Sequence, residues 1–119
     1  MSSLKYKQWG KSISIDLFDC DISLFTPKDL KRYIQEIIKV VDMVAHGECH
    51  VDRFGIGELE GYSAMQFIET SSITVHTDDP GKRVFIDIFS CKDFDSKKAE
   101  LFSKAFYKAK YAKAVTLIR

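Results

Sequence analysis

Two short runs of this chain alternate polar and apolar residues, and this alternation constrains the fold more than any other feature. Residues 12–18 alternate until their last two positions, whereas residues 72–77 alternate throughout and are rich in β-branched side chains. A strand with this period places one face on a hydrophobic core and leaves the other face in solvent. We therefore predict strands at both positions.

A long apolar stripe predicts a helix between these strands. Thr26 followed by Pro27 is typical of a helix start, because the hydroxyl caps the first turn and proline fits the first helical position. We expect this helix to end before a C-cap at Gly47, and a second helix to begin at Asp95 or Ser96. The stripe has spacings of three and one residues, and its members are Leu30, Tyr33, Ile34, Ile37, Ile38, Val41 and Val44.

Three further apolar segments complete the predicted sheet. Residues 64–68 and 112–118 are predicted strands, and residues 84–89 are so apolar that we expect burial on both faces or nearly so. Residues 49–61, with three glycines, are predicted as a loop, and the Asp-Asp-Pro-Gly turn at 78–81 favours antiparallel pairing. The order strand, helix, three strands, helix, strand predicts an α+β two-layer sandwich, with both helices on one face of a mostly antiparallel sheet.

Length and composition limit the number of domains and the kind of partner. The 119 residues are too few for two ordinary domains, so we expect one domain over residues 1–119. Eighteen basic and seventeen acidic residues leave a net charge of +1, which gives no broad attraction to nucleic acid or anionic lipid. No segment resembles a membrane span or a secretory signal, and an odd count of three cysteines fits a reducing compartment. We expect a cytoplasmic protein with a small-molecule partner, no nucleic acid and no membrane.

Several side chains could carry chemistry. Ser71 lies next to Ser72 and shortly before His76, and the following predicted strand leads to Cys91, so a nucleophile, a base and a thiol acid are close in sequence. These residue types alone are better explained by a turn, a solvent-facing histidine and a buried thiol. His46, Cys49 and His50 form no spacing suited to a closed zinc site, so we predict no metal and place them at a helix end and in a polar loop.

The order of these residues resembles that of a known enzyme family. Residues 61–63, 70–77 and 86–91, together with residues 15–21 near the start, are similar to the prokaryotic type of S-adenosylmethionine decarboxylase, a small pyruvoyl enzyme. The resemblance covers most of the chain. Its spacings place His76 five residues after Ser71, Cys91 twenty after it and Ser63 eight before it.

The resemblance implies a zymogen that cleaves itself between residues 70 and 71. Ser71 would attack the carbonyl of Thr70, and elimination and hydrolysis would leave a pyruvoyl group as the cofactor. Ser63 and His76 are implied in processing, and Cys91 as the proton donor during decarboxylation. The implied pathway is polyamine synthesis, including spermidine, and Phe54 is the candidate for stacking on the adenine of the substrate.

A straight strand cannot bring Ser71 and His76 together. Five residues separate them by roughly 16 Å and place them on opposite faces. Either the backbone folds back at the cleavage site or two protomers complete each site, and the family is similar in building sites from more than one chain. We expect a homodimer in which two sandwiches stack into four αββα layers.

Some positions depart from the family pattern. Thr70 and Ser72 stand where the family has glutamate and histidine, and Asp78, beside Asp79, stands where it has an aromatic residue. A loss of stacking and a gain of carboxylates suggest one alternative, a pyruvoyl decarboxylase of ornithine or arginine, although both aspartates also suit a solvated turn. A second alternative is an uncleaved member that acts as a regulatory partner.

Overall fold

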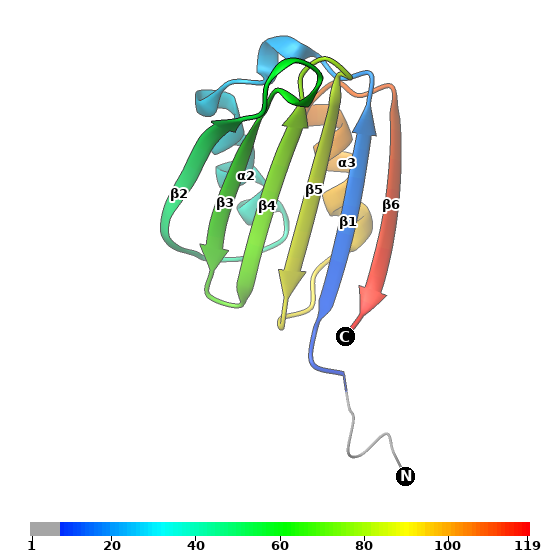
Figure 1. The fold of residues 1–119 in the computed structure, drawn as a ribbon. Helices are drawn as coiled ribbons and strands as arrows, with labels where there is room; N and C mark the ends of the chain where they lie inside the picture. Colours follow the sequence, from blue (N-terminus) through cyan, green and yellow to red (C-terminus); the bar gives the residue numbers. More distant parts are fainter. Residues whose placement is uncertain (1–7) are drawn as a thin grey trace.

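A six-stranded antiparallel sheet organises the chain (Figure 1). The computed structural model describes residues 8–119, and the strands lie in the order β2-β3-β4-β5-β1-β6. Two single-turn 3-10 helices, η1 (Ile22–Leu24) and η2 (Gly57–Leu59), lie in the connections. The strands are β1 (Lys11–Phe18), β2 (Ala45–Phe54), β3 (Gly61–Ile68), β4 (Ser71–Asp78), β5 (Arg83–Ser90) and β6 (Tyr111–Ile118).

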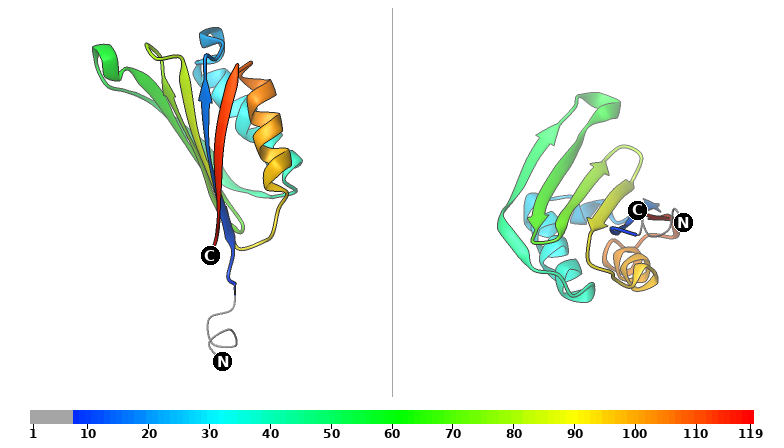
Figure 2. Two further views of the ribbon diagram at one scale, coloured as in Figure 1. Left: turned by 90° about the vertical axis from the view of Figure 1, so that its right-hand side faces the viewer. Right: turned by 90° about the horizontal axis from the view of Figure 1, so that it is seen from below.

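Both α-helices cover the same face of this sheet (Figure 2). α2 (Pro27–Val40) begins where Thr26 Oγ1 accepts the N–H of Asp29 at 3.1 Å, and α3 (Ser96–Phe106) begins where Asp95 accepts the N–H of Lys98 at 3.0 Å. Side-chain acceptors satisfy amides that the first helical turn leaves unpaired. The predicted two-layer α+β sandwich and both helix starts are confirmed.

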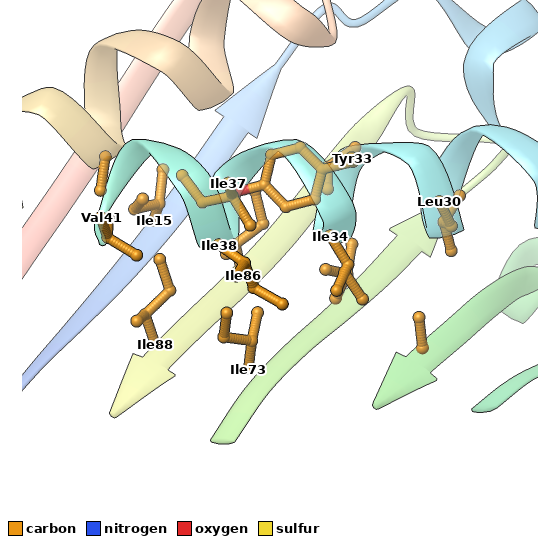
Figure 3. Packing of buried hydrophobic residues seen from close by; sticks show 14 of the residues in the cluster. Ile15, Leu30, Tyr33, Ile34, Ile37, Ile38, Val41, Ile73, Ile86 and Ile88 are labelled. Carbon is orange, nitrogen blue, oxygen red and sulfur yellow. The ribbon is translucent and has the colours of Figure 1, made fainter. Parts of the chain in front are cut away.

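The core lies between the helices and the sheet. Figure 3 shows Ile34 and Ile37 of α2 facing the sheet, where Ile73, Ile86 and Ile88 project from β4 and β5. All five side chains are at most 1% exposed. Burial of this kind is the main favourable term in folding, so the alternation seen in the sequence selects the face that α2 covers.

α2 ends earlier than its apolar stripe predicts. Val41 is the C-cap, and the next residue, Asp42, has a φ of 57°, which a right-handed helix cannot continue through. Val44, the last residue of the predicted stripe, is 56% exposed. The predicted cap at Gly47 is therefore wrong, because the chain has already turned towards the sheet.

The segment predicted as a loop from residue 49 contains a strand instead. β2 runs through to Phe54, so four strands rather than three lie between the helices, and His46, Cys49 and His50 belong to this strand. It lies at the sheet edge, where only Cys49 and Val51 are even half-buried, so it lacks the alternation that marks the other strands. Its register shifts between His46 and His50, and Gly47 there has a φ of 75°, as a β-bulge permits.

The other face of the sheet is not covered by any element of residues 8–119. The expectation that β5 would be buried on both faces is wrong for one chain, since Asp87 is exposed and Phe85 and Phe89 are only half-buried. Five large apolar side chains on this open face are between 45% and 63% exposed: Phe54, Met65, Phe67, Val115 and Leu117. An apolar surface of this kind marks an interaction site in a soluble protein.

Two buried tyrosines, Tyr33 of α2 and Tyr107 at the C-cap of α3, differ in their hydrogen bonding. Tyr33 and Tyr107 are fully buried, with ring centroids 5.3 Å apart. The hydroxyl of Tyr33 lies 2.6 Å from Ser103 Oγ, whereas the hydroxyl of Tyr107 has no hydrogen-bond partner among the described residues. Burial without a partner costs free energy that a hydrogen bond would offset.

We expect Tyr107→Phe to raise the free energy of unfolding by about 1 kcal/mol, because it removes an unpaired buried hydroxyl. Tyr33→Phe should lower the same free energy by about 1 kcal/mol, because it leaves Ser103 short of a partner. Urea unfolding followed by circular dichroism compares the two variants directly. Equal destabilisation by both substitutions would contradict the assignment of the hydrogen bonds.

Candidate functional site

A serine and a histidine meet on the open face of the sheet. The register of β3 and β4 sets Ser63 directly opposite His76, and Ser63 Oγ lies 2.8 Å from His76 Nδ1. Directly opposed residues in an antiparallel pair bring their side chains together, so this contact follows from the register. A hydroxyl at hydrogen-bond distance from an imidazole is a pair that can transfer a proton.

An open depression of about 210 Å³ adjoins this pair. β2 contributes His50, Asp52 and Phe54 to its lining, opposite Ser63 and His76. The ring of Phe54 is 57% exposed and therefore available for stacking. The sequence prediction includes Phe54 but misses His50 and Asp52, because it treats this part of the chain as a loop instead of a strand beside β3.

Ser71 lies at the opposite end of β4. It is the first residue of the strand, directly after a two-residue turn formed by Glu69 and Thr70, and it pairs with Ile68 and Ser90. Two-residue hairpin turns favour positive φ within the turn, but here the positive value falls on Ser71, at 156°. A serine seldom adopts this conformation, so the backbone is strained at the predicted cleavage site.

The peptide bond before Ser71 is held by Cys91. The carbonyl oxygen of Thr70 accepts the backbone N–H of Cys91 at 2.9 Å, where the chain leaves β5. A donor at this distance polarises the carbonyl and would stabilise negative charge on its oxygen. The thiol of Cys91 is exposed, so it is accessible to a bound molecule at this end of the sheet.

The structure brings the predicted residues together as two separate pairs. β4 is one continuous strand from Ser71 to Asp78, so the backbone does not fold back between Ser71 and His76. Five residues of strand span roughly 16 Å. Ser63 and His76 therefore lie at one end, while Ser71 and Cys91 lie at the other end.

Asp78 and Asp79 follow β4, close to the histidine. Asp78 Oδ2 lies 2.7 Å from Arg83 Nε, and Asp79 Oδ2 lies 2.9 Å from Arg53 Nη1. Asp79 also accepts the hydroxyl of Thr77 at 2.9 Å. Both carboxylates thus have a cationic partner within the chain, which reduces the charge they offer to a cationic substrate.

Other candidate features lie outside these pairs. Among residues 8–119, no group of three or more histidine, cysteine, aspartate or glutamate side chains is arranged to hold a metal ion. None of the helices in this part of the chain combines the length and the apolar character of a membrane span.

Comparison with known proteins identifies close relatives. A sequence model of the family described as S-adenosylmethionine decarboxylase matches residues 11–119. An S-adenosylmethionine decarboxylase proenzyme of Clostridium botulinum is 32% identical over 102 residues, which cover 85% of this chain and 84% of the relative. A protein of the same name from Saccharolobus islandicus is 34% identical over 82 residues, which cover 69% and 64% of the two chains.

A solved structure has the same fold. The crystal structure of the adenosylmethionine decarboxylase from Aquifex aeolicus superposes with a TM-score of 0.80. The match covers 96% of this chain and 92% of that chain, at 20% sequence identity. The sheet with two helices on one face is therefore shared with that protein.

The three thiols should differ in reactivity. Cys20 is 6% exposed, and burial, assisted by the charge of Asp19, raises the pKa of its thiol to about 11. At pH 8 only about a thousandth of Cys20 is therefore thiolate, the form that reacts. Burial also raises the pKa of Cys49, while Cys91 is exposed.

We expect an alkylating reagent at pH 8 to modify Cys91 first and native Cys20 very slowly, as followed by mass spectrometry of peptides. The rate at Cys20 should rise about tenfold per pH unit up to about pH 11, since the thiolate fraction rises by that factor. Cys91→Ser should abolish the first phase. Rapid native labelling of Cys20 at pH 8 would contradict the burial described here.

Proposed function

Because the chain belongs to the S-adenosylmethionine decarboxylase family, we propose that it decarboxylates S-adenosylmethionine with a pyruvoyl cofactor made from its own Ser71. The name proenzyme, carried by its relatives, supports a chain that matures after synthesis. The product would enter polyamine synthesis, including that of spermidine. The free cysteines of the described chain suit a cytoplasmic location.

The observation that carries this proposal is the geometry around the Thr70 carbonyl. The strained φ of Ser71 and the N–H of Cys91 on the Thr70 oxygen are the two features that a peptide needs before a neighbouring hydroxyl can attack it. Both are supplied by backbone, so they persist although Thr70 and Ser72 replace the family's glutamate and histidine.

The proposed cleavage proceeds in three steps. Ser71 Oγ loses its proton and bonds to the carbonyl carbon of Thr70, while the bond from that carbon to the Ser71 nitrogen breaks and the nitrogen gains a proton. A base then removes the α-hydrogen of Ser71, and the Cβ–Oγ bond of the ester breaks, which frees Thr70 as a carboxylate. Water then hydrolyses the resulting dehydroalanine: its nitrogen leaves as ammonia, and the oxygen of water becomes the ketone oxygen. A pyruvoyl group therefore begins the new chain.

A homodimer supplies the base for this elimination. His76 lies too far from Ser71 in its own chain, so we propose that His76 and Ser63 of the partner subunit act at Ser71 and Cys91. The exposed apolar residues of the open face would be buried when two sheets stack in a four-layer αββα arrangement. A two-fold axis between the sheets reverses one relative to the other, which can bring opposite ends of β4 together.

In turnover, the pyruvoyl carbonyl supplies the electron sink needed when carbon dioxide leaves the substrate. Cys91 lies beside the position where that carbonyl forms, and its exposed thiol can return a proton to the substrate carbon. In the proposed dimer the depression beside His76 belongs to the partner subunit, so the partner's Phe54 offers its ring to the adenine and the carboxylate of the partner's Asp52 favours the positive sulfonium.

We expect the purified chain to consist of two fragments, residues 1–70 and 71–119, with a ketone at the start of the second. Intact-mass spectrometry and reaction of the ketone with a hydrazine measure this. Ser71→Ala should remain a single chain with no carbonyl label, because it lacks the attacking hydroxyl. A wild-type chain that stays intact after long incubation would refute the proposal and favour the regulatory-partner alternative.

Release of carbon dioxide from S-adenosylmethionine, ornithine and arginine distinguishes the substrates. We propose activity on S-adenosylmethionine alone. Asp78 pairs with Arg83 and Asp79 pairs with Arg53, so neither carboxylate is free to bind the cationic side chain of ornithine or arginine. Activity on ornithine or arginine would support the alternative reading of the two aspartates.

A complementation experiment tests whether each site is shared between protomers. Ser71→Ala and His76→Ala should each be inactive alone. Co-expressed, they should recover about a quarter of the wild-type activity, because half of the dimers would be mixed and each would hold one complete site. Carbon dioxide release from S-adenosylmethionine by the purified mixture is the measurement.

The matched control combines both substitutions in one chain and co-expresses it with wild type. Mixed dimers of that pair hold Ser71 and His76 only in the same protomer, so they contain no complete shared site. Wild-type homodimers alone should therefore give this control mixture about a quarter of the wild-type activity. A site built within one protomer would instead leave about half of the activity in the control mixture and none in the complementary pair, and that result would contradict a shared site.

A further inference from the structure

A chain of hydroxyl groups, fully buried at Ser90 and half-buried at Thr70, reaches the residue before the cleavage site. Ser90 Oγ accepts the backbone N–H of Lys92 at 3.0 Å and donates to Thr70 Oγ1 at 2.8 Å. Thr70 Oγ1 in turn donates to Met43 Sδ at 3.4 Å. Ser90 Oγ also lies 3.6 Å from Met43 Sδ, but the shorter contact directs its single hydrogen to Thr70 Oγ1. Each oxygen then accepts one hydrogen and donates one.

The relay is anchored at both ends. Ser90 is fully buried. Met43, which follows α2 in the chain, is 8% exposed and belongs to the hydrophobic core. Lys92 is fixed by its Nζ, which donates to the carbonyl oxygen of Asp42 at 2.8 Å and pairs with its carboxylate at 3.1 Å. The contact between Lys92 and Asp42 is exposed, but Ser90 and Met43 are buried, and hydrogen bonds shielded from water hold geometry more firmly than the same bonds in water.

Thr70 is thereby held at two points. Its carbonyl oxygen accepts a hydrogen bond from the N–H of Cys91. Its side-chain hydroxyl accepts one from the hydroxyl of Ser90, the residue before Cys91. Together these bonds limit rotation about the Cα–C bond of Thr70, which sets the direction in which its carbonyl carbon faces the next residue. A small error in such an orientation slows attack strongly, because the reacting atoms must approach along a narrow range of directions.

We propose that Ser90 is a positioning residue for self-cleavage, which acts through the side chain of Thr70 to hold the scissile carbonyl towards Ser71. This inference rests on the proposed function, because it concerns the rate at which Ser71 forms the ester with Thr70. It assigns a purpose to the threonine that departs from the family pattern: a hydroxyl at this position completes the relay.

The test is the rate of fragment formation, measured by intact mass from newly synthesised chain at fixed temperature. Ser90→Ala should slow cleavage about tenfold, the scale of one lost hydrogen bond at the reacting group. Thr70→Val should slow it by a similar factor, whereas Thr70→Ser, which retains the hydroxyl, should remain within about threefold of wild type. The double variant Ser90→Ala with Thr70→Val should be no slower than either single variant, because both remove the same contact.

Ser103→Ala is the matched control for loss of stability. Ser103 is also fully buried and hydrogen-bonded, to Tyr33 and to the carbonyl of Ala99, but it lies on α3 away from the turn. It should unfold at lower urea concentration and still cleave at the wild-type rate. Urea midpoints of all variants, measured in the non-cleaving Ser71→Ala background, make the comparison at known stability.

The outcomes separate this inference from the proposed function. If wild type cleaves but Ser90→Ala cleaves equally fast, if Thr70→Ser is as slow as Thr70→Val, or if the two single effects add, the positioning role is overturned while self-cleavage stands. If Ser103→Ala slows cleavage as much as Ser90→Ala at matched stability loss, the effect is a general one and the inference also fails. If wild type never cleaves, both proposals fail together.

Discussion

The antiparallel register of β3, β4 and β5 is the constraint on which the proposed chemistry depends. It sets Ser63 against His76 near one end of β4, and Ser71 against Ser90 at the other end. A shift of one residue would move every side chain of β4 to the opposite face, bringing Ile73 and Val75 out of the core. Packing of these two residues under α2 therefore also holds the reactive groups in register.

In the proposed dimer, the asymmetry of the sheet leaves each chain with half of a site. α2 and α3 satisfy one face, and the other face carries both the Ser63–His76 pair and a set of exposed apolar side chains. The surface that would stabilise a dimer is thus the surface that carries His76, which we propose acts on the other subunit. Association and catalysis would draw on one region, so substitutions there affect both.

Local sequence patterns predict most of the fold but not its edges. The alternation and the Thr26–Pro27 start identify the central strands and α2, because these depend on burial and capping within short segments. β2 escapes prediction because an edge strand with a bulge at Gly47 buries little on either face. The end of α2 depends on Asp42, whose positive φ no periodic pattern reveals.

The candidate site divides in the same way. The family resemblance identifies Ser63, Ser71, His76 and Cys91 by their spacing, and these positions remain predictions of function. The contacts of Thr70 with Ser90 and Cys91 join segments about twenty residues apart, so only the strand pairing makes them visible. Likewise, Asp52 becomes a candidate for substrate contact only once β2 is placed beside β3.

The strand order has a mechanical consequence for a chain cut in the β3–β4 turn. The first fragment would retain β1, β2 and β3, and the second would retain β4, β5 and β6, yet β1 lies between β5 and β6. The two fragments would therefore be interleaved, joined by hydrogen bonds along three strand boundaries instead of one. Dissociation of the fragments would require the hydrogen bonds of all three strand pairs to break, so the cleaved chain can resist dissociation as well as the intact chain resists unfolding.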